Sequence, residues 1–490
     1  MRREQALHGA MPGTASAPTP STRSPGRVIA EADWLAREPV YYDASTGHVS
    51  RDVHELIRDR AWRFDPEGLR NYLEFGFSVF GQTPFENVRF LLPCQRALRD
   101  ESGALRIEDR PDPATFDASF EMDEATLLET LRQRVATWAA SRSGVIVIPT
   151  SGGYDSRLLN LWVERREQVR AFTYGISTDQ PRSREVLRAR EVCRRLDVTW
   201  DRIELGRYHE RMPDWYDLVG PVVHAHGMYQ IEFYHAVRDR LAPEDMARAC
   251  VLSGIIGDVW AGTVHVPPID DPGDLIQASY AHGLAADPTA CRLPVREDRR
   301  RQFFERYRDH LADPRGRVVV AMRLKLMLLR YLLEVPASLG FDVWTPFLEP
   351  DVAMAMLMLP PDRRRGRAWQ RQALAAAGFE PLIGRFAGDA SFGLDHVAAR
   401  LVPLEPLDAE ALSEAIRPDY VEHVNREVLE PSRWSRWRRR AGDRPLLGAA
   451  LGRIGAPDPW LRAYAAYMTL WPLQEAIIRR GGFDPSAAPP

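Results

Sequence analysis

Residues 144–160, GVIVIPTSGGYDSRLLN, restrict the possible folds of this chain more than any other stretch. Four consecutive β-branched residues, from Val145 to Ile148, predict a short buried strand. Two glycines, an aspartate and a serine follow closely, and after them comes the apolar spacing of a helix. A strand that passes through a glycine loop into a helix predicts a parallel βαβ unit.

Strand and helix patterns continue to alternate after this unit. The predicted strands are VRAFTYG, VTWDRIEL and ACVLSG, and SREVLRAREVCRRL is a helix between the first two. Another helix, DEATLLETLRQRVATWAA, precedes the first strand. The alternation predicts an α/β fold over residues 120–390, with a doubly wound parallel sheet and helices on both of its faces.

The flanking segments have different patterns. Residues 1–27 are rich in Pro, Ser, Thr, Ala and Arg and predict a disordered tail. Residues 28–115 predict a small N-terminal α+β domain, with two strands about a turn in PVYYDASTGHV and a helix in PEGLRNYLEFGF. From about Asp271 the pattern is mostly helical, with MRLKLMLLRYLLEV as the strongest amphipathic run. Residues 391–490 are predicted to be a helical C-terminal extension.

The composition excludes several classes of function. The 490 residues are 45% apolar with a formal net charge of −3, so no global field attracts nucleic acid or an anionic membrane. No segment approaches the ~18 uninterrupted apolar residues that would span a bilayer. The four cysteines lie far apart and form no zinc or disulfide pattern. We therefore expect a cytoplasmic protein with no nucleic-acid or membrane partner.

Three further features have less direct interpretations. Lys325 is the only lysine, and on its amphipathic run we expect a surface or snorkelling side chain. RWSRWRRR, at 433–440, could seat a nucleic acid, but we interpret it as a solvated helix face anchored by Trp434 and Trp437. The stretch HAHGMYQIEFYH either faces a substrate pocket or holds core and surface histidines, namely His224, His226 and His235.

The chemistry of the SGGYDS loop favours a metal-bound nucleotide. Gly152 and Gly153 let backbone N–H groups approach an anion, and the helix that starts near Ser156 adds its N-terminal partial charge. Ser151 and Ser156 can donate hydroxyl hydrogen bonds to phosphate. Asp155 would repel a bare phosphate, which makes sense if its carboxylate holds Mg²⁺. The alternative is a turn followed by a helix cap without any ligand.

The same loop resembles the pyrophosphatase loop of the ATP pyrophosphatases, a group that includes asparagine, GMP, NAD and argininosuccinate synthetases and tRNA-modifying ligases. A second stretch, ACVLSGIIGDVWAG at 249–262, resembles the Ser-Gly-x-x-x-Asp motif of the asparagine synthetase family. That resemblance implies that Ser253 and Gly254 meet the nucleotide and that Asp258 helps to bind magnesium. The alternative for Asp258 is a loop residue that caps a helix.

The resemblance extends over residues 37–378. WTPFLEPDVAMAMLMLPPDRRR, SREVLRAREVCRRLDVTW, REPVYYDASTGHV and LRNYLEFGFSVFGQTPFENVRFLLP are similar to segments of the same family, the last two to its N-terminal glutaminase domain. By this resemblance Thr150 and Tyr174 would present atoms to adenine. The family lysine that meets the phosphoryl intermediate is replaced in GRAWQRQAL, where Arg367 and Arg371 are available and Arg367 is the candidate catalytic residue.

Two departures change what the resemblance implies. A glutamine-dependent enzyme needs an N-terminal Cys nucleophile after Met1, whereas this chain has Arg2. We therefore expect a vestigial glutaminase domain with no hydrolysis of glutamine. Ile255 stands where asparagine-forming members carry a glutamate, which argues against free aspartate as the substrate.

The resemblance implies an ATP- and Mg²⁺-dependent ligase that activates a carboxylate as an acyl-adenylate, releases pyrophosphate and forms an amide. The expected partners are a small-molecule or peptide carboxylate and an amine donor, and formation of a homodimer is left open. A peptide macrolactam cyclase of the lasso type is the alternative within this class. A nucleotide-binding scaffold without turnover is the alternative from another class.

Overall fold

The computed structural model describes residues 26–480, apart from 59–61, 117–121, 280–283, 297, 381, 383–387, 390, 436 and 438–457. The predicted disordered tail therefore falls outside the described residues, except for its last two. Of these, Arg27 is the first residue of strand β1 (Arg27–Glu31) and pairs with Arg99.

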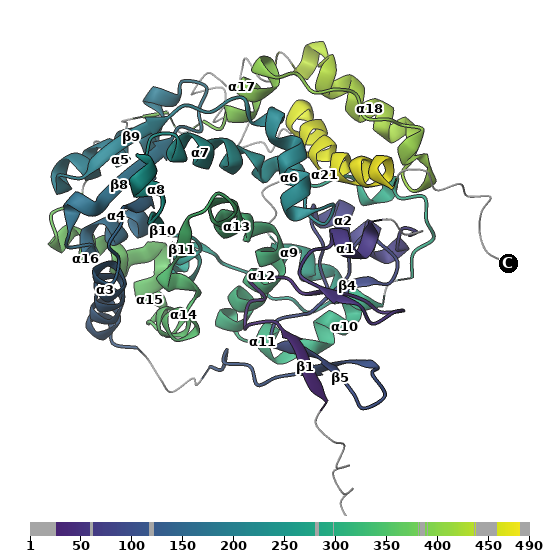
Figure 1. Ribbon diagram of the computed structural model, residues 1–490, viewed down its shortest axis with the longest axis horizontal. Coiled ribbons are helices and arrows are strands. Elements are labelled where there is room, and N and C mark those ends of the chain that lie inside the picture. The colour runs from purple at the N-terminus through teal and green to yellow at the C-terminus, as the bar shows by residue number, and fades with distance from the viewer. Residues whose placement is uncertain are drawn as a thin grey trace, which may run out of the picture.

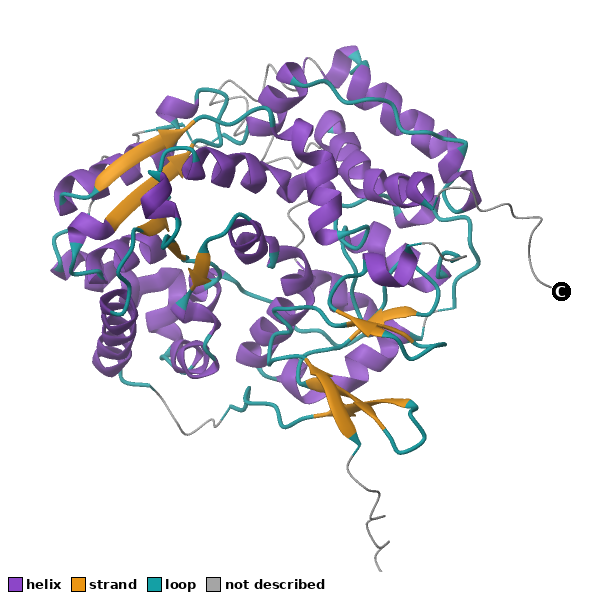
Figure 2. Ribbon diagram, viewed as in Figure 1, coloured by secondary structure: helices purple, strands orange, loops and turns teal. Residues whose placement is uncertain are grey.

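A five-stranded parallel sheet forms the centre of the α/β part (Figures 1 and 2). Its strand order is β11-β10-β7-β8-β9, and every pairing between neighbours is parallel. The strands are β7 (Ile146–Pro149), β8 (Val169–Tyr174), β9 (Thr199–Ile203), β10 (Cys250–Leu252) and β11 (Asp342–Trp344). The chain runs outward from β7 to β9 and then returns to the other side of β7, so a topological switch point lies between β7 and β10. In an open α/β sheet, ligands bind at such a point.

Helices cover the sheet in two groups, and the predicted α/β class with a doubly wound parallel sheet is confirmed (Figure 2). In one group, α4 (Tyr154–Trp162) contacts α3 (Glu124–Ala140), α5 (Arg184–Leu196) and α16 (Ala368–Ala376). In the other, α7 (Tyr229–Arg238) and α13 (Tyr331–Ser338) contact each other and the outer strands β9 and β11. Short helices α6 (Met212–Val219) and α8 (Pro243–Met246) lie between β9 and β10 along the chain.

Strand β11 is an addition to the mostly helical pattern predicted after Asp271, which is otherwise confirmed. It has three residues and pairs with β10, with Val251 opposite Val343. Three residues contain too little of an alternating pattern to reveal a strand. The other predicted strands and helices of this part are present, although α4 begins at Tyr154 rather than near Ser156.

In its described residues, the N-terminal segment has two three-stranded antiparallel sheets and two helices. One sheet has the order β1-β5-β6 and the other β3-β2-β4. The predicted turn in PVYYDASTGHV joins β2 and β3, and the predicted helix is α2, which Asp65 caps by accepting a hydrogen bond from the Gly68 N–H. The elements are β2 (Tyr41–Asp43), β3 (Val49–Ser50), α1 (His54–Ile57), α2 (Pro66–Phe75), β4 (Val88–Phe90), β5 (Gln95–Arg99) and β6 (Leu105–Asp109).

The rest of the described chain is helical, as predicted, apart from β11. Its helices are α9 (Leu275–Ser279), α10 (Arg299–Arg306), α11 (Arg308–Ala312), α12 (Pro314–Leu329), α14 (Pro350–Leu357), α15 (Pro361–Arg364), α17 (Leu394–Leu401), α18 (Pro418–Leu429) and α21 (Pro459–Arg479). In α21, Thr469 O accepts a hydrogen bond from Tyr72 Oη at 3.0 Å, and Tyr464 Oη lies 2.9 Å from His209 Nε2. The last helix thus packs against both the N-terminal segment and the α/β part.

Helix α12 is buried, and the amphipathic pattern predicted for it is wrong. The predicted run divides into α12 and α13 at Arg330, and every residue of α12 from Gly316 onward is buried. Its charged side chains are held inside the protein. For example, Arg317 donates from Nε to the Val266 carbonyl at 3.1 Å.

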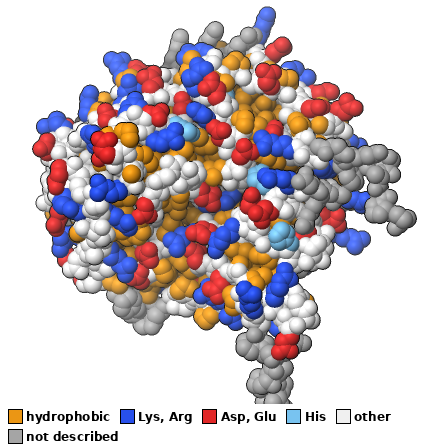
Figure 3. All heavy atoms as spheres, in the orientation of Figure 1, with side chains coloured by type: hydrophobic (Ala, Val, Ile, Leu, Met, Phe, Trp, Pro, Cys, Tyr) orange, Lys and Arg blue, Asp and Glu red, His pale blue; other side chains and the backbone are white. Residues whose placement is uncertain are grey.

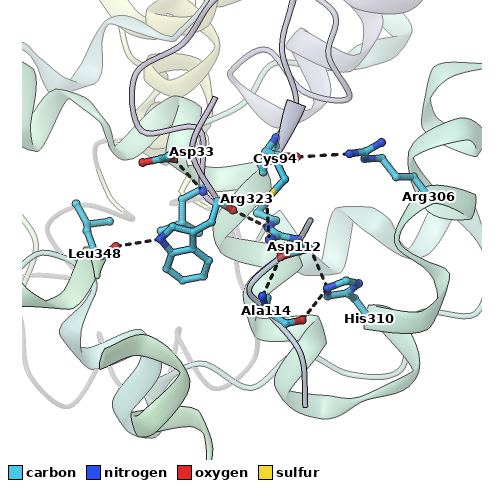
Figure 4. Close-up of polar contacts among 11 residues, drawn as sticks. Asp33, Cys94, Asp112, Ala114, Arg306, His310, Arg323 and Leu348 are labelled. Carbon is cyan, nitrogen blue, oxygen red and sulfur yellow. Dashed lines mark hydrogen bonds and ion pairs between the residues drawn. The ribbon is translucent and has the colours of Figure 1, made fainter. Parts of the chain in front are cut away.

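Arg323 of α12 links the N-terminal segment to the helical core by hydrogen bonds (Figure 4). Its guanidinium donates to both carboxylate oxygens of Asp112 at 2.6 Å and to the Trp34 carbonyl at 3.0 Å. His310 Nε2 lies 3.3 Å from the same carboxylate. Trp34 in turn donates from its indole to the Leu348 carbonyl at 3.0 Å, and its ring lies 5.8 Å from that of Trp260.

No helix among the described residues is long and apolar enough to cross a membrane.

On the face shown in Figure 3, basic and acidic side chains are interspersed, and hydrophobic side chains gather between the parallel sheet and the N-terminal sheets.

Candidate active site

A cavity of about 560 Å³ opens where β7, β8 and β10 end, at the switch point of the sheet. Its walls come from the β7–α4 loop, the end of β8, the segment after β10, helices α7 and α12–α13, and Arg367. Ten of the eleven predicted site residues line it: Thr150, Ser151, Gly153, Asp155, Ser156, Tyr174, Ser253, Gly254, Asp258 and Arg367. Gly152 is the exception, because it faces α5 instead.

The conformation of the β7–α4 loop requires glycine at 152. Gly152 has a φ of +66°, and a Cβ there would lie 2.3 Å from the Cβ of Arg188 on α5. The next residue, Gly153, is the N-cap of α4 and has no side chain to satisfy the free N–H groups of the first turn. Ser151 Oγ accepts from the Gly153 N–H at 3.2 Å. The first turn of α4 thus presents N–H groups and a partial positive charge at the cavity.

Asp155 projects from the first turn of α4 and is only 9% exposed. Gln370 donates from Nε2 to Asp155 Oδ1 at 2.7 Å, and Arg367 Nη1 lies 3.6 Å from Oδ2. Burial and the neighbouring negative charge of Asp258 raise the pKa of the Asp155 carboxyl to about 6. The partial compensation by Gln370 and Arg367 leaves a carboxylate in an environment that would gain from a bound cation.

The segment after β10 brings Asp258 toward Asp155. A Cβ on Gly257 would lie 2.9 Å from Asp155 Oδ1, too close without a shift, whereas one on Gly254 would be in ordinary contact, 3.5 Å from the Asp155 Cβ. Asp258 precedes a helical turn, Val259–Thr263, but its side chain makes no capping hydrogen bond. The capping alternative is therefore wrong for Asp258. Two carboxylates that face one cavity fit Mg²⁺, which is commonly held by one or two carboxylates together with phosphate oxygens.

Arg367 lies at the start of α16 with a φ of +55°, a conformation uncommon for residues other than glycine. Its guanidinium stacks 4.6 Å above the Tyr154 ring, and a quarter of the side chain is exposed. Gln370, one turn further along α16, was not predicted as a site residue. Its signal was the spacing in GRAWQ, which places residues 367 and 370 on one face of a helix. Arg371 is exposed and does not line the cavity.

Lys325 is fully buried, and the prediction of a surface or snorkelling lysine is wrong. Burial lowers the pKa of its ammonium to about 7, and the negative charge of Asp258 opposes this shift. The only lysine of the chain is thus close enough to interact electrostatically with the carboxylate of Asp258. Its flanking apolar residues lie on every side of the helix, which was the available sign of a buried helix rather than an amphipathic one.

The remaining wall of the cavity is mainly apolar, and its polar members are Thr173, Glu185 and Gln230. Ile255, which replaces the glutamate of the asparagine-forming enzymes, is 8% exposed and lines the cavity. Its neighbour Ile256 has a φ of +55°, which is unusual for a β-branched residue and indicates local strain. Tyr174 accepts a hydrogen bond from Gln230 Nε2 at 3.2 Å and packs against Phe233. The other apolar lining residues include Tyr234, Val259, Leu329 and Leu332.

The histidines of 224–235 do not line this cavity. His226 Nε2 lies 2.9 Å from Asp395 Oδ1, and Tyr208 Oη donates to the same oxygen at 2.7 Å. His224 is buried, and His235 Nδ1 accepts from Arg238 at 3.1 Å. The three side chains are therefore core and surface histidines rather than residues of the substrate pocket.

The predicted anchoring of RWSRWRRR is wrong for its two tryptophans. Trp434 and Trp437 stack on each other with ring centroids 4.8 Å apart, and they are 54% and 49% exposed. Residues 436 and 438–440 of this stretch lie outside the described residues.

The comparison with known proteins gives likenesses to solved structures only. No protein-family model matches the sequence, and no curated protein matches it. Among solved structures, the chain is similar to an NH3-dependent NAD synthetase from Campylobacter jejuni subsp. jejuni NCTC 11168, in complex with the nitrate ion. The match has 11% sequence identity and a TM-score of 0.24, and it covers 43% of this chain and 96% of the other. A likeness at this level carries no argument about activity.

Proposed function

We propose that the chain is an ATP- and Mg²⁺-dependent amide-forming ligase of the asparagine synthetase type. It would activate a carboxylate as an acyl-adenylate, release pyrophosphate, and transfer the acyl group to an amine or ammonia. The observation that carries the proposal is the approach of Asp155 and Asp258, from the ends of two neighbouring strands, inside the cavity that the SGGYDS loop lines.

Each part of the cavity has a role in this proposal. The N–H groups at the start of α4 and the hydroxyls of Ser151 and Ser156 would bind the phosphates. Asp155 and Asp258 would hold Mg²⁺, which when bound would neutralise negative charge on the phosphates. Thr150 and Tyr174 lie at the ends of β7 and β8, where they would contact the adenine.

Arg367 would neutralise the charge that develops as pyrophosphate leaves. Its guanidinium lies at the boundary between the loop and Asp155, and a planar fork can bind two phosphate oxygens at once. Arginine stays protonated, so it cannot act as a proton donor in the way that a lysine can.

The acyl part of the substrate would be apolar and would lack a free ammonium near the reacting carboxyl. Ile255, Val259 and Leu329 present no charge that could pair with an amino group. A buried ammonium without a partner costs a few kcal/mol, enough to reject aspartate by orders of magnitude. Fatty or aryl acids, N-acylated amino acids and peptides with an apolar acyl terminus fit this wall better than aspartate does.

The experiment measures the products of ATP cleavage with a panel of carboxylic acids, in the presence of ammonia or an amine. We expect AMP and pyrophosphate, strictly dependent on Mg²⁺. Asp155→Asn and Asp258→Asn should each lower the rate on the order of 100-fold or more, whereas Asp201→Asn, an exposed residue of β9, should not change it. Formation of ADP, or full activity in both site variants, would exclude the proposal. ATP binding without turnover on any acid would favour a scaffold.

A further inference from the structure

The stretch RWSRW, residues 433–437, carries the only exposed tryptophans of the described chain. Trp434 is 54% exposed and Trp437 49%, and their rings stack with centroids 4.8 Å apart and an interplanar angle of 21°. Eight large hydrophobic side chains are exposed in the part of the chain that the structure describes, and three of them lie within residues 429–437, namely Leu429 and these two tryptophans. Such a concentration of exposed apolar surface marks an interaction site rather than scattered surface residues.

The helical turn that carries the two tryptophans is anchored by serines. Ser435 is 1% exposed, and its hydroxyl donates to the Glu427 carboxylate on α18. The Ser432 hydroxyl donates to the same carboxylate oxygen at 3.2 Å and accepts from the Ser435 N–H at 3.1 Å. A spacing of three residues places Trp434 and Trp437 on one face of the turn. The polar residue between them is therefore buried while the aromatic face is exposed, the reverse of a helix face that packs on a hydrophobic core.

The charge of this stretch is entirely positive. Residues 431–440 contain five arginines and no aspartate or glutamate, and Arg433 is exposed. Within the described residues, the Arg433 guanidinium makes no hydrogen bond or ion pair. An arginine of this kind beside an exposed aromatic pair favours a ligand that carries both carboxylates and apolar groups.

A protein segment fits this surface better than a nucleic acid does. A base of a single strand binds an aromatic side chain by stacking on an open face of its ring, whereas the Trp434 and Trp437 rings already cover one face of each other. The formal net charge of the chain is −3, so no global field attracts a polyanion. A stacked pair of indoles instead presents a continuous apolar ridge, and tryptophan and arginine are enriched among the residues that carry the binding energy of protein–protein contacts.

We propose that Arg433, Trp434 and Trp437 form a docking surface for an acidic, amphipathic segment of a partner protein. Apolar side chains of that segment pack on the indole ridge, and its aspartate or glutamate side chains pair with Arg433. The surface belongs to the C-terminal extension, and none of its three residues lines the main cavity. The inference therefore does not depend on the proposed reaction.

The experiment measures the binding of short fluorescein-labelled peptides to the full-length protein by fluorescence anisotropy, without ATP. The probe is a synthetic peptide made of glutamate and leucine, and the comparison peptide has glutamine in place of each glutamate. We expect saturable binding of the acidic peptide that weakens as salt rises from about 0.05 to 0.5 M. The glutamine peptide should bind at least about tenfold more weakly at low salt, because it cannot pair with Arg433.

Trp434→Ala and Trp437→Ala should each weaken binding of the acidic peptide by about tenfold or more. Arg433→Glu should also weaken it, because the substitution places a like charge against the peptide. Two matched controls should bind like the wild type: Ile478→Ala removes an equally exposed apolar side chain from α21, and Arg190→Glu reverses the charge of an exposed arginine on α5. The substituted side chains are exposed, so urea unfolding of every variant should match that of the wild type, which separates a loss of docking from a loss of fold.

Several outcomes would overturn the proposal. Absence of saturable binding by the wild type is one, and wild-type affinity in both tryptophan variants is another. Tighter binding of oligothymidylate than of the acidic peptide, lost in Trp434→Ala, would make the surface a nucleic-acid site. A dimer of the wild type that becomes a monomer in Trp434→Ala, measured by sedimentation, would assign the surface to a second copy of this chain. Should the tryptophan variants fail to fold, Arg433→Glu decides independently, and unchanged binding in that variant refutes the surface.

Discussion

Asp155→Asn should make the metal-free protein more stable at neutral pH while it removes activity. The Asp155 carboxyl is 9% exposed, and its pKa is raised from 3.8 to about 6 by burial and by Asp258. The folded state therefore holds a proton more tightly than the unfolded chain. Protonation of Asp155 therefore stabilises the folded state. This stabilisation is fully present below pH ~4 and is lost as the pH rises through about 6. Asparagine is neutral at every pH and keeps that stability.

The magnitude follows from the two pKa values. A shift of about two units corresponds to about 3 kcal/mol at pH 7.5, where both states of the wild type are ionised. At pH 4.5 the same linkage leaves a difference of only about 1 kcal/mol. The advantage of the variant should thus shrink by about 2 kcal/mol between these two values.

The assay is urea unfolding followed by tryptophan fluorescence, in EDTA, at pH 4.5 and 7.5. Asp201→Asn, in which an exposed aspartate is neutralised, is the control and should show no gain at either pH. Adding Mg²⁺ and ATP should stabilise the wild type but not the Asp155 variant, so the difference in unfolding free energy between the two proteins should become smaller. Two results would refute the assignment of Asp155 as a buried carboxylate that Asp258 destabilises by repulsion. One is a variant no more stable than the wild type at pH 7.5, and the other is a gain in unfolding free energy that does not change with pH.

Three other predictions concern the substrate and the N-terminal segment. Burial raises the pKa of the thiols of Cys94, Cys193, Cys250 and Cys291, so none is an activated nucleophile. The protein should therefore release no glutamate from glutamine, and release above a no-enzyme control would contradict this. Ile255→Glu should raise pyrophosphate release with aspartate and lower it with apolar acids, and no change in the ratio would show that this wall does not select the acyl group. Arg323→Met should cost roughly 2–4 kcal/mol of unfolding free energy, because it leaves the Asp112 carboxylate without its bidentate partner. Adding Asp112→Leu should recover part of that loss in the same urea assay, and a fully additive double variant would argue against a coupled pair.

Local sequence predicted strands of the parallel sheet and the SGGYDS loop that joins β7 to α4. The run from Val145 to Ile148 is apolar on both faces and β-branched throughout, which predicts a buried strand, and its last three residues lie in β7. Gly152 was predicted as a loop glycine that lets N–H groups approach an anion, whereas the structure requires glycine there for its φ of +66° and its packing on Arg188. Such signals lie within a few residues of one another and do not depend on the rest of the chain.

Only the tertiary structure decided the surroundings of the carboxylates. Gln370 and Asp155 are separated by 215 residues along the chain. The GRAWQ spacing places Gln370 beside Arg367, but no local pattern predicts the hydrogen bond of Gln370 with Asp155. The three residues of β11 are a strand because β10 offers them a partner, not because of their own pattern.

Lys325 and Arg188 show the same limit for charged side chains. Each looks like an ordinary basic residue on a helix, yet one is fully buried and the other lines a cavity behind the loop. The physical reason is that a local pattern reports the periodicity of its own element, whereas burial, pKa and the approach of charges depend on which distant elements pack against it.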